Sequence, residues 1–390
     1  MYTTSKRKQQ MAFRESSNES VVYENGILYE NEAEAEDCEL KKQPRKIAAE
    51  RTFEYKWFNM FMISFLHVQA VYGAYLAITG HAKWQTLFFA YVLYIASGLG
   101  ITAGAHRLWT HRTFEAKWPL KLMLVIFNTI AFQNSLFHWC RDHRIHHKFS
   151  DTDADPHNAT RGFFFSHCGW LMIKKHPHVI AAGKRVDLSD LENDSFVMFQ
   201  KNHGLWMFVL FCFILPTYIP YYFWNESLWN SWLIPTCLRY AAVLNITWCV
   251  NSLAHIWGHK PYDKSILASQ NVFVSIIALG EGWHNYHHVF PWDYKVMNLY
   301  KGCHKSVIIM SLISQTAELG NYRLNLTTMF IDFMAKIGWA YDLKTVNKEI
   351  VDKRKKRTGD STQTNIWGWA DPDQSKSDKN MAKIIFKNYN

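Results

Sequence analysis

The sequence predicts an all-α integral membrane protein with four transmembrane helices. Three observations support this fold class: four apolar runs grouped in two pairs, positive charge on one side of them, and histidine clusters outside them. Hydrophobic residues make up 48% and aromatic residues 16% of the 390 residues, which excludes a mostly disordered chain. The mean hydropathy of −0.20 would suit a soluble protein, but it averages apolar blocks with polar ones.

The chain begins with a polar segment, residues 1–48, which carries an acidic patch over residues 30–39. Such a segment cannot bury enough apolar surface to fold by itself, so we predict a disordered tail. No short apolar stretch follows a basic start, and we therefore expect no cleavable signal peptide.

Four apolar runs are long enough to cross a bilayer, which takes about 20 residues of helix. Short loops join the first run to the second and the third to the fourth, so the runs form two hairpins. A large soluble helical core is the alternative, but runs of this length with almost no charge favour membrane spans. Arg239 is the exception, and we expect it to snorkel or to face protein. The predicted spans cover residues 57–79, 85–104, 205–223 and 230–250.

The distribution of positive charge predicts the orientation in the membrane. Residues 105–204, which lie between the two hairpins, carry 13 Lys and Arg residues. The short loops inside the hairpins carry only Lys83 and the acidic Glu226. Because cytoplasmic loops hold the excess of Lys and Arg, residues 105–204, residues 251–340 and both termini are predicted to be cytosolic. Residues 341–390 form a basic and polar C-terminal tail.

Nine of the 19 histidines fall in four clusters that follow the second and fourth predicted spans. Two membrane crossings separate these positions, so all four clusters lie on one face of the membrane. The HxxHH spacing of two clusters puts three imidazoles on one side of a helix. Nine imidazoles without thiolates suit iron, zinc, copper or nickel and are too many for one tetrahedral zinc ion, so a dinuclear centre is predicted. The nine are His106, His111, His143, His146, His147, His255, His284, His287 and His288.

Carboxylates stand next to these clusters. Glu281 precedes the last cluster, and Asp151, Asp153 and Asp155 follow the second. We expect them to orient the histidines or to form loops, rather than to bind metal themselves. The sequence has no H-E-x-x-H motif of a zinc protease and no G-x-G-x-x-G dinucleotide fingerprint. Electrons for any redox reaction would therefore come from another protein.

The motifs HRLWTH, HRIHH and HNYHH resemble the three histidine boxes of the membrane acyl-CoA desaturases, the stearoyl-CoA desaturase family. The resemblance extends over about residues 49–340, includes GITAGAHRLWTHR, ADPHNATRGFFFSH and GEGWHNYHH, and is most detailed with insect enzymes, moth enzymes in particular. It implies a desaturase domain in which a cytosolic helical cap, formed by residues 105–204 and 251–340, holds two iron ions.

The resemblance also implies an activity. The enzyme would use O2 to insert a double bond into a long-chain saturated acyl-CoA, with electrons from cytochrome b5 and its NADH-dependent reductase. Delta-9 insertion is slightly favoured, and delta-11 insertion, as in pheromone precursor synthesis, is possible. The location would be the endoplasmic reticulum membrane, with membrane lipid as a partner and no nucleic acid.

A role for single residues follows from the same resemblance. One metal would take His106, His111, His143, His147 and His288; the other would take His146, His255, His284 and His287, with a water held by Asn251. The CoA head group would meet Asn59, Asn134, Arg141, Asp142, Lys174 and Lys175, although the two lysines would equally suit a lipid head-group surface. The acyl chain would pass Gln133, Trp139, Thr247 and Trp248 and end near Tyr94 and Gly98.

Two other functions remain open at this point. A membrane hydroxylase uses similar histidine boxes and would yield a hydroxylated lipid. A non-catalytic metal-binding protein or metal transporter would place its histidines at membrane depth, along a pore. Nearly all the clusters lie outside the predicted spans, which disfavours a transporter.

Overall fold

The computed structural model describes residues 22–24, 27–29, 54–296 and 325–360. Within the predicted disordered tail it describes only the antiparallel strands β1 (Val22–Glu24) and β2 (Ile27–Tyr29). The rest of that tail, and the end of the basic C-terminal tail, lie outside the described residues.

Four helical runs are long and apolar enough to cross a membrane, as predicted. The first is α3 (Trp57–Ile78), and the second joins α4 (Trp84–Leu99) to the π-helix η1 (Gly100–Thr110). The third consists of α10 (Ser195–Phe208), η4 (Val209–Ile214) and α11 (Leu215–Trp224). The fourth consists of α12 (Leu228–Ser231), η5 (Trp232–Leu238), α13 (Arg239–Asn251) and α14 (Leu253–Ile256).

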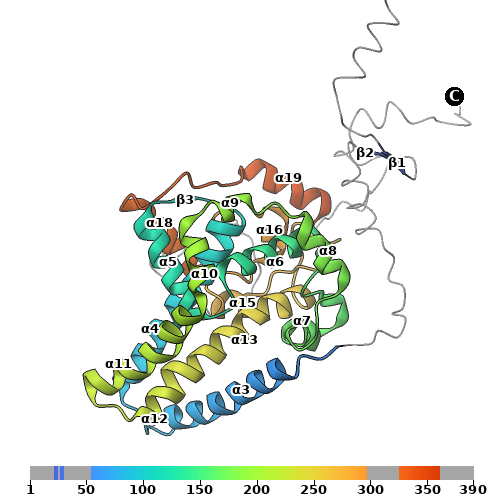
Figure 1. Cartoon of the computed structure of the whole chain (residues 1–390). Coiled ribbons are helices and arrows are strands. Elements are labelled where there is room, and N and C mark those ends of the chain that lie inside the picture. Colours follow the sequence, from blue (N-terminus) through green and yellow to red (C-terminus); the bar gives the residue numbers. More distant parts are fainter. Residues whose placement is uncertain (1–21, 25–26, 30–53, 297–324, 361–390) are drawn as a thin grey trace, which may run out of the picture.

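The last three runs contain 27 to 30 residues each. Because about 20 residues cross the apolar layer, these helices continue beyond it. Figure 1 shows where they lead: the turn between α11 and α12 lies at one end of the spans, and the cap gathers at the other. The residues at the ends of these helices therefore form part of the cap.

Arg239 faces protein within the fourth span, as expected. Only 3% of its surface is exposed. Its guanidinium donates to the carbonyls of Pro235 at 3.0 Å, Ile130 at 2.8 Å and Cys212 at 3.1 Å. These bonds satisfy a charge that would be costly in lipid.

The centre of the cap is a bent pair of helices, α5 (Trp118–Ala131) and α6 (Leu136–Lys148), which meet at 84°. Phe132 (φ 45°) and Asn134 (φ 74°) make the bend in the left-handed region. Ser135 then caps α6 by accepting a hydrogen bond from the backbone N–H of His138. The bend turns α6 back over the ends of the spans.

Short elements complete the cap. Strands β3 (Glu115–Ala116) and β4 (Ala340–Tyr341) pair antiparallel, with Glu115 opposite Tyr341. The remaining elements are η2 (Ala159–Arg161), α7 (Phe163–His167), η3 (Gly169–Leu171), α8 (Pro177–Arg185), α9 (Ser189–Glu192), α15 (Val272–Ile277), α16 (His284–Val289), α18 (Leu326–Lys336) and α19 (Lys348–Thr358).

Close packing fixes η1 against α5. A Cβ atom on Gly100 would lie 2.2 Å from the backbone nitrogen of Asn128, so only glycine fits. Beyond this contact, Leu120, Leu124 and Leu136 are fully buried in the largest apolar cluster of the cap. These contacts pack the beginning of η1 closely against α5.

Candidate metal centre and apolar cavity

Four elements from distant parts of the sequence bring the nine predicted histidines together. His106 lies in η1 and His111 directly follows it, while α6 carries the HRIHH motif. His255 lies in α14, and α16 carries the HNYHH motif. Among the described residues, their ring nitrogens form two groups, each within 4.8 Å: His106, His111, His143, His147 and His287 in cluster A, and His146, His255, His284 and His288 in cluster B.

The nitrogen separations fit metal coordination. In cluster A, Nε2 of His287 lies 2.9 Å from Nε2 of His106 and 2.9 Å from Nε2 of His147. In cluster B, Nε2 of His284 lies 3.0 Å from Nε2 of both His255 and His288. Two ligands at right angles around a metal, with bonds of about 2.1 Å, are about 3 Å apart.

The protonation of the rings also fits. Burial lowers the pKa of His287 and of His288 well below the usual value, so both rings are neutral at physiological pH. A metal binds the neutral imidazole through its lone pair. In the part of the chain that the structure describes, the buried Nε2 atoms of His111, His143 and His146 have no hydrogen-bond partner. A metal ion in each cluster would supply that partner.

The structure corrects one expected assignment. His288 was expected in the group of His106, and His287 in the group of His146, but the two residues exchange places. The physical reason is helical spacing: His284 and His288, four residues apart, point within about 40° of each other, whereas His287 is turned about 60° from His284 in the opposite sense. On α6 the same rule puts His143 and His147 in cluster A and His146 in cluster B.

Carboxylates contact the far side of three histidine rings. Nδ1 of His146 lies 3.0 Å from both oxygens of Asp155, and Nδ1 of His255 lies 3.3 Å from Asp151. Nδ1 of His106 lies 3.0 Å from Glu281. The hydrogen bonds between Asp155 and His146 hold the orientation of that ring, as a carboxylate partner does for a metal ligand. Asp153, expected in the same role, lies instead beside His176 and His178.

Arg107 is a site residue that the sequence did not single out. It is fully buried and lies 2.8 Å from Glu281. Burial alone would raise the pKa of Glu281, but the charge of Arg107, together with His106 and the hydrogen bonds from both residues, outweighs burial and lowers that pKa to about 2. The ionised Glu281 therefore connects Arg107 to the ring of His106.

An apolar cavity adjoins both clusters. His106, His143 and His284 line one part of it, together with Asn251, for which a water-holding role was expected. Four residues expected along the acyl chain also line it: Tyr94, Gly98, Trp139 and Thr247. The cavity therefore extends from the two histidine clusters to α4 in the second span.

Two other expected acyl-chain residues stand back from this cavity. Gln133 supports its wall by donating a hydrogen bond to Oγ1 of Thr247 at 2.8 Å. Trp248 is not among the described residues that line it, because its ring packs against His67 and His167. The next residue along a helix points about 100° away, and the ring of Trp248 accordingly lies on another side of α13 than Thr247.

Most residues expected at the CoA head group lie near one another. Asn59 in α3 donates to the carbonyl of Leu171 at 2.9 Å. Lys174 pairs with Glu54, and Lys175 pairs with Asp142. Arg141 lies 2.9 Å from Asp142, and Asn134 is exposed at the bend before α6.

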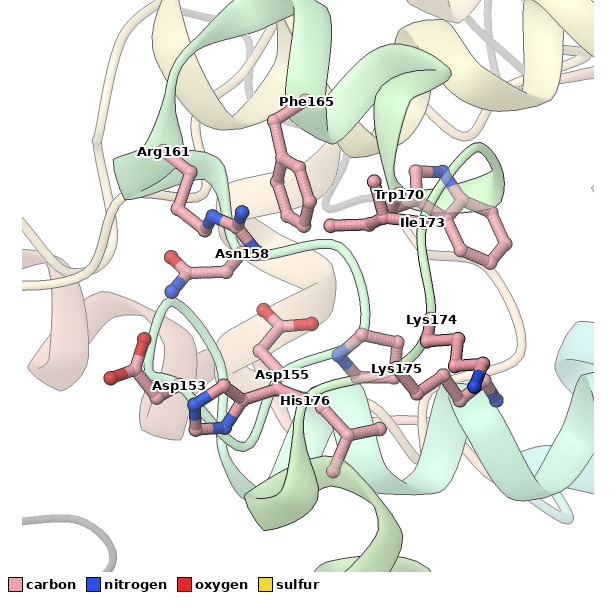
Figure 2. A pocket seen from close by; sticks show the side chains of 12 residues that line it. Asp153, Asp155, Asn158, Arg161, Phe165, Trp170, Ile173, Lys174, Lys175 and His176 are labelled. Carbon is pink, nitrogen blue, oxygen red and sulfur yellow. The ribbon is translucent and has the colours of Figure 1, made fainter. Parts of the chain in front are cut away.

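Figure 2 shows Lys174 and Lys175 among the residues that line a second pocket. Asn158 and Arg161 line it as well. They belong to the motif ADPHNATRGFFFSH, for which no separate role was predicted. This motif is the feature of the sequence from which the pocket could have been predicted.

Fold and site together define a multi-pass membrane protein that places an apolar cavity beside two histidine clusters. The model of the fatty acid desaturase family matches residues 82–296, and the chain belongs to this family of oxidoreductases. It is 54% identical to an acyl-CoA delta-9 desaturase of Acheta domesticus, over 84% of this chain and 85% of the relative. It is 51% identical to an acyl-CoA delta(11) desaturase of Trichoplusia ni, over 94% and 97%. Stearoyl-CoA desaturase 2 of Mus musculus is 49% identical, over 79% and 80%.

Replacing Asp155 with asparagine is expected to weaken metal binding by about 10–100-fold, because the ring of His146 loses its carboxylate partner. Metal content after dialysis against graded chelator concentrations measures this effect. Asp187→Asn, at an exposed position of the cap, is the matched control and should keep its metal. Equal metal retention in both variants would show that Asp155 does not support the site.

Proposed function

We propose that the chain is an acyl-CoA desaturase that inserts a double bond into a long-chain saturated acyl-CoA, with iron in clusters A and B and O2 as co-substrate. The observation that carries this proposal is the apolar cavity that adjoins both clusters. The printed names of the relatives agree with an acyl-CoA substrate.

The metal would supply the one step that side chains cannot perform, the oxidation of an unactivated alkyl chain. All other tasks belong to the chain itself. The cavity wall, with Trp139 and Thr247, would exclude water and hold the acyl chain in one position. The residue pairs His146–Asp155 and His106–Glu281 would keep the ligand rings in place.

The CoA phosphates would bind near Lys174, Lys175 and Arg141. Cationic side chains make strong, charge-assisted hydrogen bonds with phosphate oxygens. Lys174 forms an ion pair with Glu54, and Lys175 forms one with Asp142. Binding of acyl-CoA would therefore exchange carboxylate partners for phosphates.

Electron supply and location follow from the same proposal. Basic residues of the cap would face an acidic electron donor, which we take to be cytochrome b5 with its NADH-dependent reductase. The protein would lie in the endoplasmic reticulum membrane with both termini in the cytosol. We also propose that the desaturase domain extends from residue 49 to residue 340.

Expression in a desaturase-deficient yeast tests the proposed function. We expect new monounsaturated acyl chains, and mass spectrometry locates their double bonds. Delta-9 products are the first expectation, and delta-11 products would indicate a pheromone precursor pathway. Hydroxylated products would favour a hydroxylase. Folded, iron-loaded protein without any new lipid product would refute an enzymatic role in lipid oxidation.

Replacing Gly98 with valine is expected to shift the product profile toward shorter acyl chains. A Cβ atom at this position would lie 2.5 Å from Cδ1 of Leu279, so a larger side chain fills the end of the cavity. The ratio of palmitoyl- to stearoyl-derived products measures the shift. Val92→Leu on the exposed face of α4 is the control, and an unchanged ratio in Gly98→Val would place the chain end elsewhere.

A further inference from the structure

A third group of metal-binding side chains lies apart from clusters A and B. It consists of Asp153, His176 and His178, whose candidate ligand atoms all lie within 4.8 Å of one another. Asp153 belongs to the turn that follows α6, and the two histidines stand at the start of α8. Figure 2 shows the carboxylate of Asp153 and the ring of His176 beside each other at one end of the second pocket.

Local structure holds the two rings in place. Nδ1 of His176 accepts a hydrogen bond from the backbone N–H of His178 at 3.2 Å, which caps α8. Pro177, at the first position of the helix, fixes the backbone between them. The ring centroids of His176 and His178 are 4.7 Å apart. All three side chains are half-buried, so an ion from solvent can reach them.

The geometry points to a zinc site. We propose that Asp153, His176 and His178 bind one zinc ion, independently of any metal in clusters A and B. Two imidazoles and one carboxylate form a common zinc ligand set, and water would complete the tetrahedron. Calcium and magnesium, which prefer oxygen ligands, fit this donor set poorly.

Zinc at this position would connect two functional parts of the cap. Asp153 stands between Asp151 and Asp155, which contact two rings of cluster B. The two histidines follow directly after Lys174 and Lys175. The ion would therefore hold the turn that contains Asp151, Asp153 and Asp155 against α8. A ligand that binds only the folded state raises its stability, so zinc should raise the melting temperature.

The test uses the full-length, iron-loaded protein in detergent, with Zn²⁺ as the probe. Equilibrium dialysis and elemental analysis give the zinc bound and the iron retained, and a thermal melt gives the stabilisation. We expect one bound zinc per chain with unchanged iron content and a raised melting temperature. X-ray absorption at the zinc edge should show nitrogen ligands. Zinc uptake matched by iron loss would mean that zinc enters clusters A and B, and would overturn the proposal.

Variants locate the ion. His178→Ala is expected to weaken zinc binding about tenfold or more, and Asp153→Asn, which preserves the size of the side chain, should act in the same direction. His259→Ala removes an exposed histidine elsewhere in the cap and should bind zinc as the parent protein does. Iron content and the zinc-free melt show that each variant is folded. Unchanged zinc affinity in both site variants, or no zinc bound by the parent protein, contradicts the proposed site.

Discussion

Replacing His287 with alanine is expected to abolish desaturation. The ring of His287 is completely buried, and its Nε2 lies 2.9 Å from the corresponding atoms of both His106 and His147. It is thus central among the five rings of cluster A. Without it, the cluster loses a neutral nitrogen donor and gains a cavity. Product formation in the desaturase-deficient yeast measures the effect on activity, and elemental analysis of the purified variant should show loss of iron.

His203→Ala provides the control, because His203 is an exposed histidine of α10. This variant should retain both activity and iron. The variant His288→Ala should also be inactive, but through the loss of metal from cluster B. Measurable turnover by His287→Ala, with iron content equal to that of the control, would exclude His287 as a metal ligand.

Replacing Arg107 with leucine should destabilise the protein by about 3–5 kcal/mol, the usual cost of leaving one partner of a buried ion pair alone. Glu281 would remain in the interior without its cation. Arg107 also donates to the carbonyl of Tyr294 at 2.6 Å and to the hydroxyl of Thr328 at 3.0 Å. The variant therefore loosens three segments of the cap at once. Unfolding in detergent, followed by circular dichroism, measures the change in free energy.

Arg112→Leu is the matched control for Arg107→Leu. The side chain of Arg112 is 51% exposed and pairs with Asp190 at 2.9 Å, and such surface pairs contribute about 0–1 kcal/mol. Loss of Arg107 should also raise the pKa of Glu281, because the guanidinium is what holds it low. Equal stability of the two variants would mean that the buried pair contributes no more than a surface pair.

The four spans could be predicted because bilayer thickness sets a minimum length for uncharged helices. The ends of the helices could not be predicted, because α4 continues through η1 to Thr110 and α13 is followed by α14 as far as Ile256. Hydropathy falls where these helices leave the membrane, although the helical structure continues. The predicted end at residue 104 thus stopped short of His106, which the same run carries.

The histidine clusters could be predicted because HxxHH spacing defines directions on a helix. That spacing alone pairs His284 with His288, and the assignment taken from family resemblance was wrong on this point. Arg107 could not be predicted as a buried residue. Its partners, Glu281, Tyr294 and Thr328, are more than 170 positions away in the sequence. Only the folded cap brings them together.

The unbroken passage from α4 into η1 makes the second span and His106 parts of a single rod. A helix adjusts its tilt to the thickness of the bilayer around it. We expect such a tilt to move His106, in η1, relative to His143 and His147, in α6. The thickness of the bilayer around α4 should therefore affect the spacing of the histidine rings in cluster A.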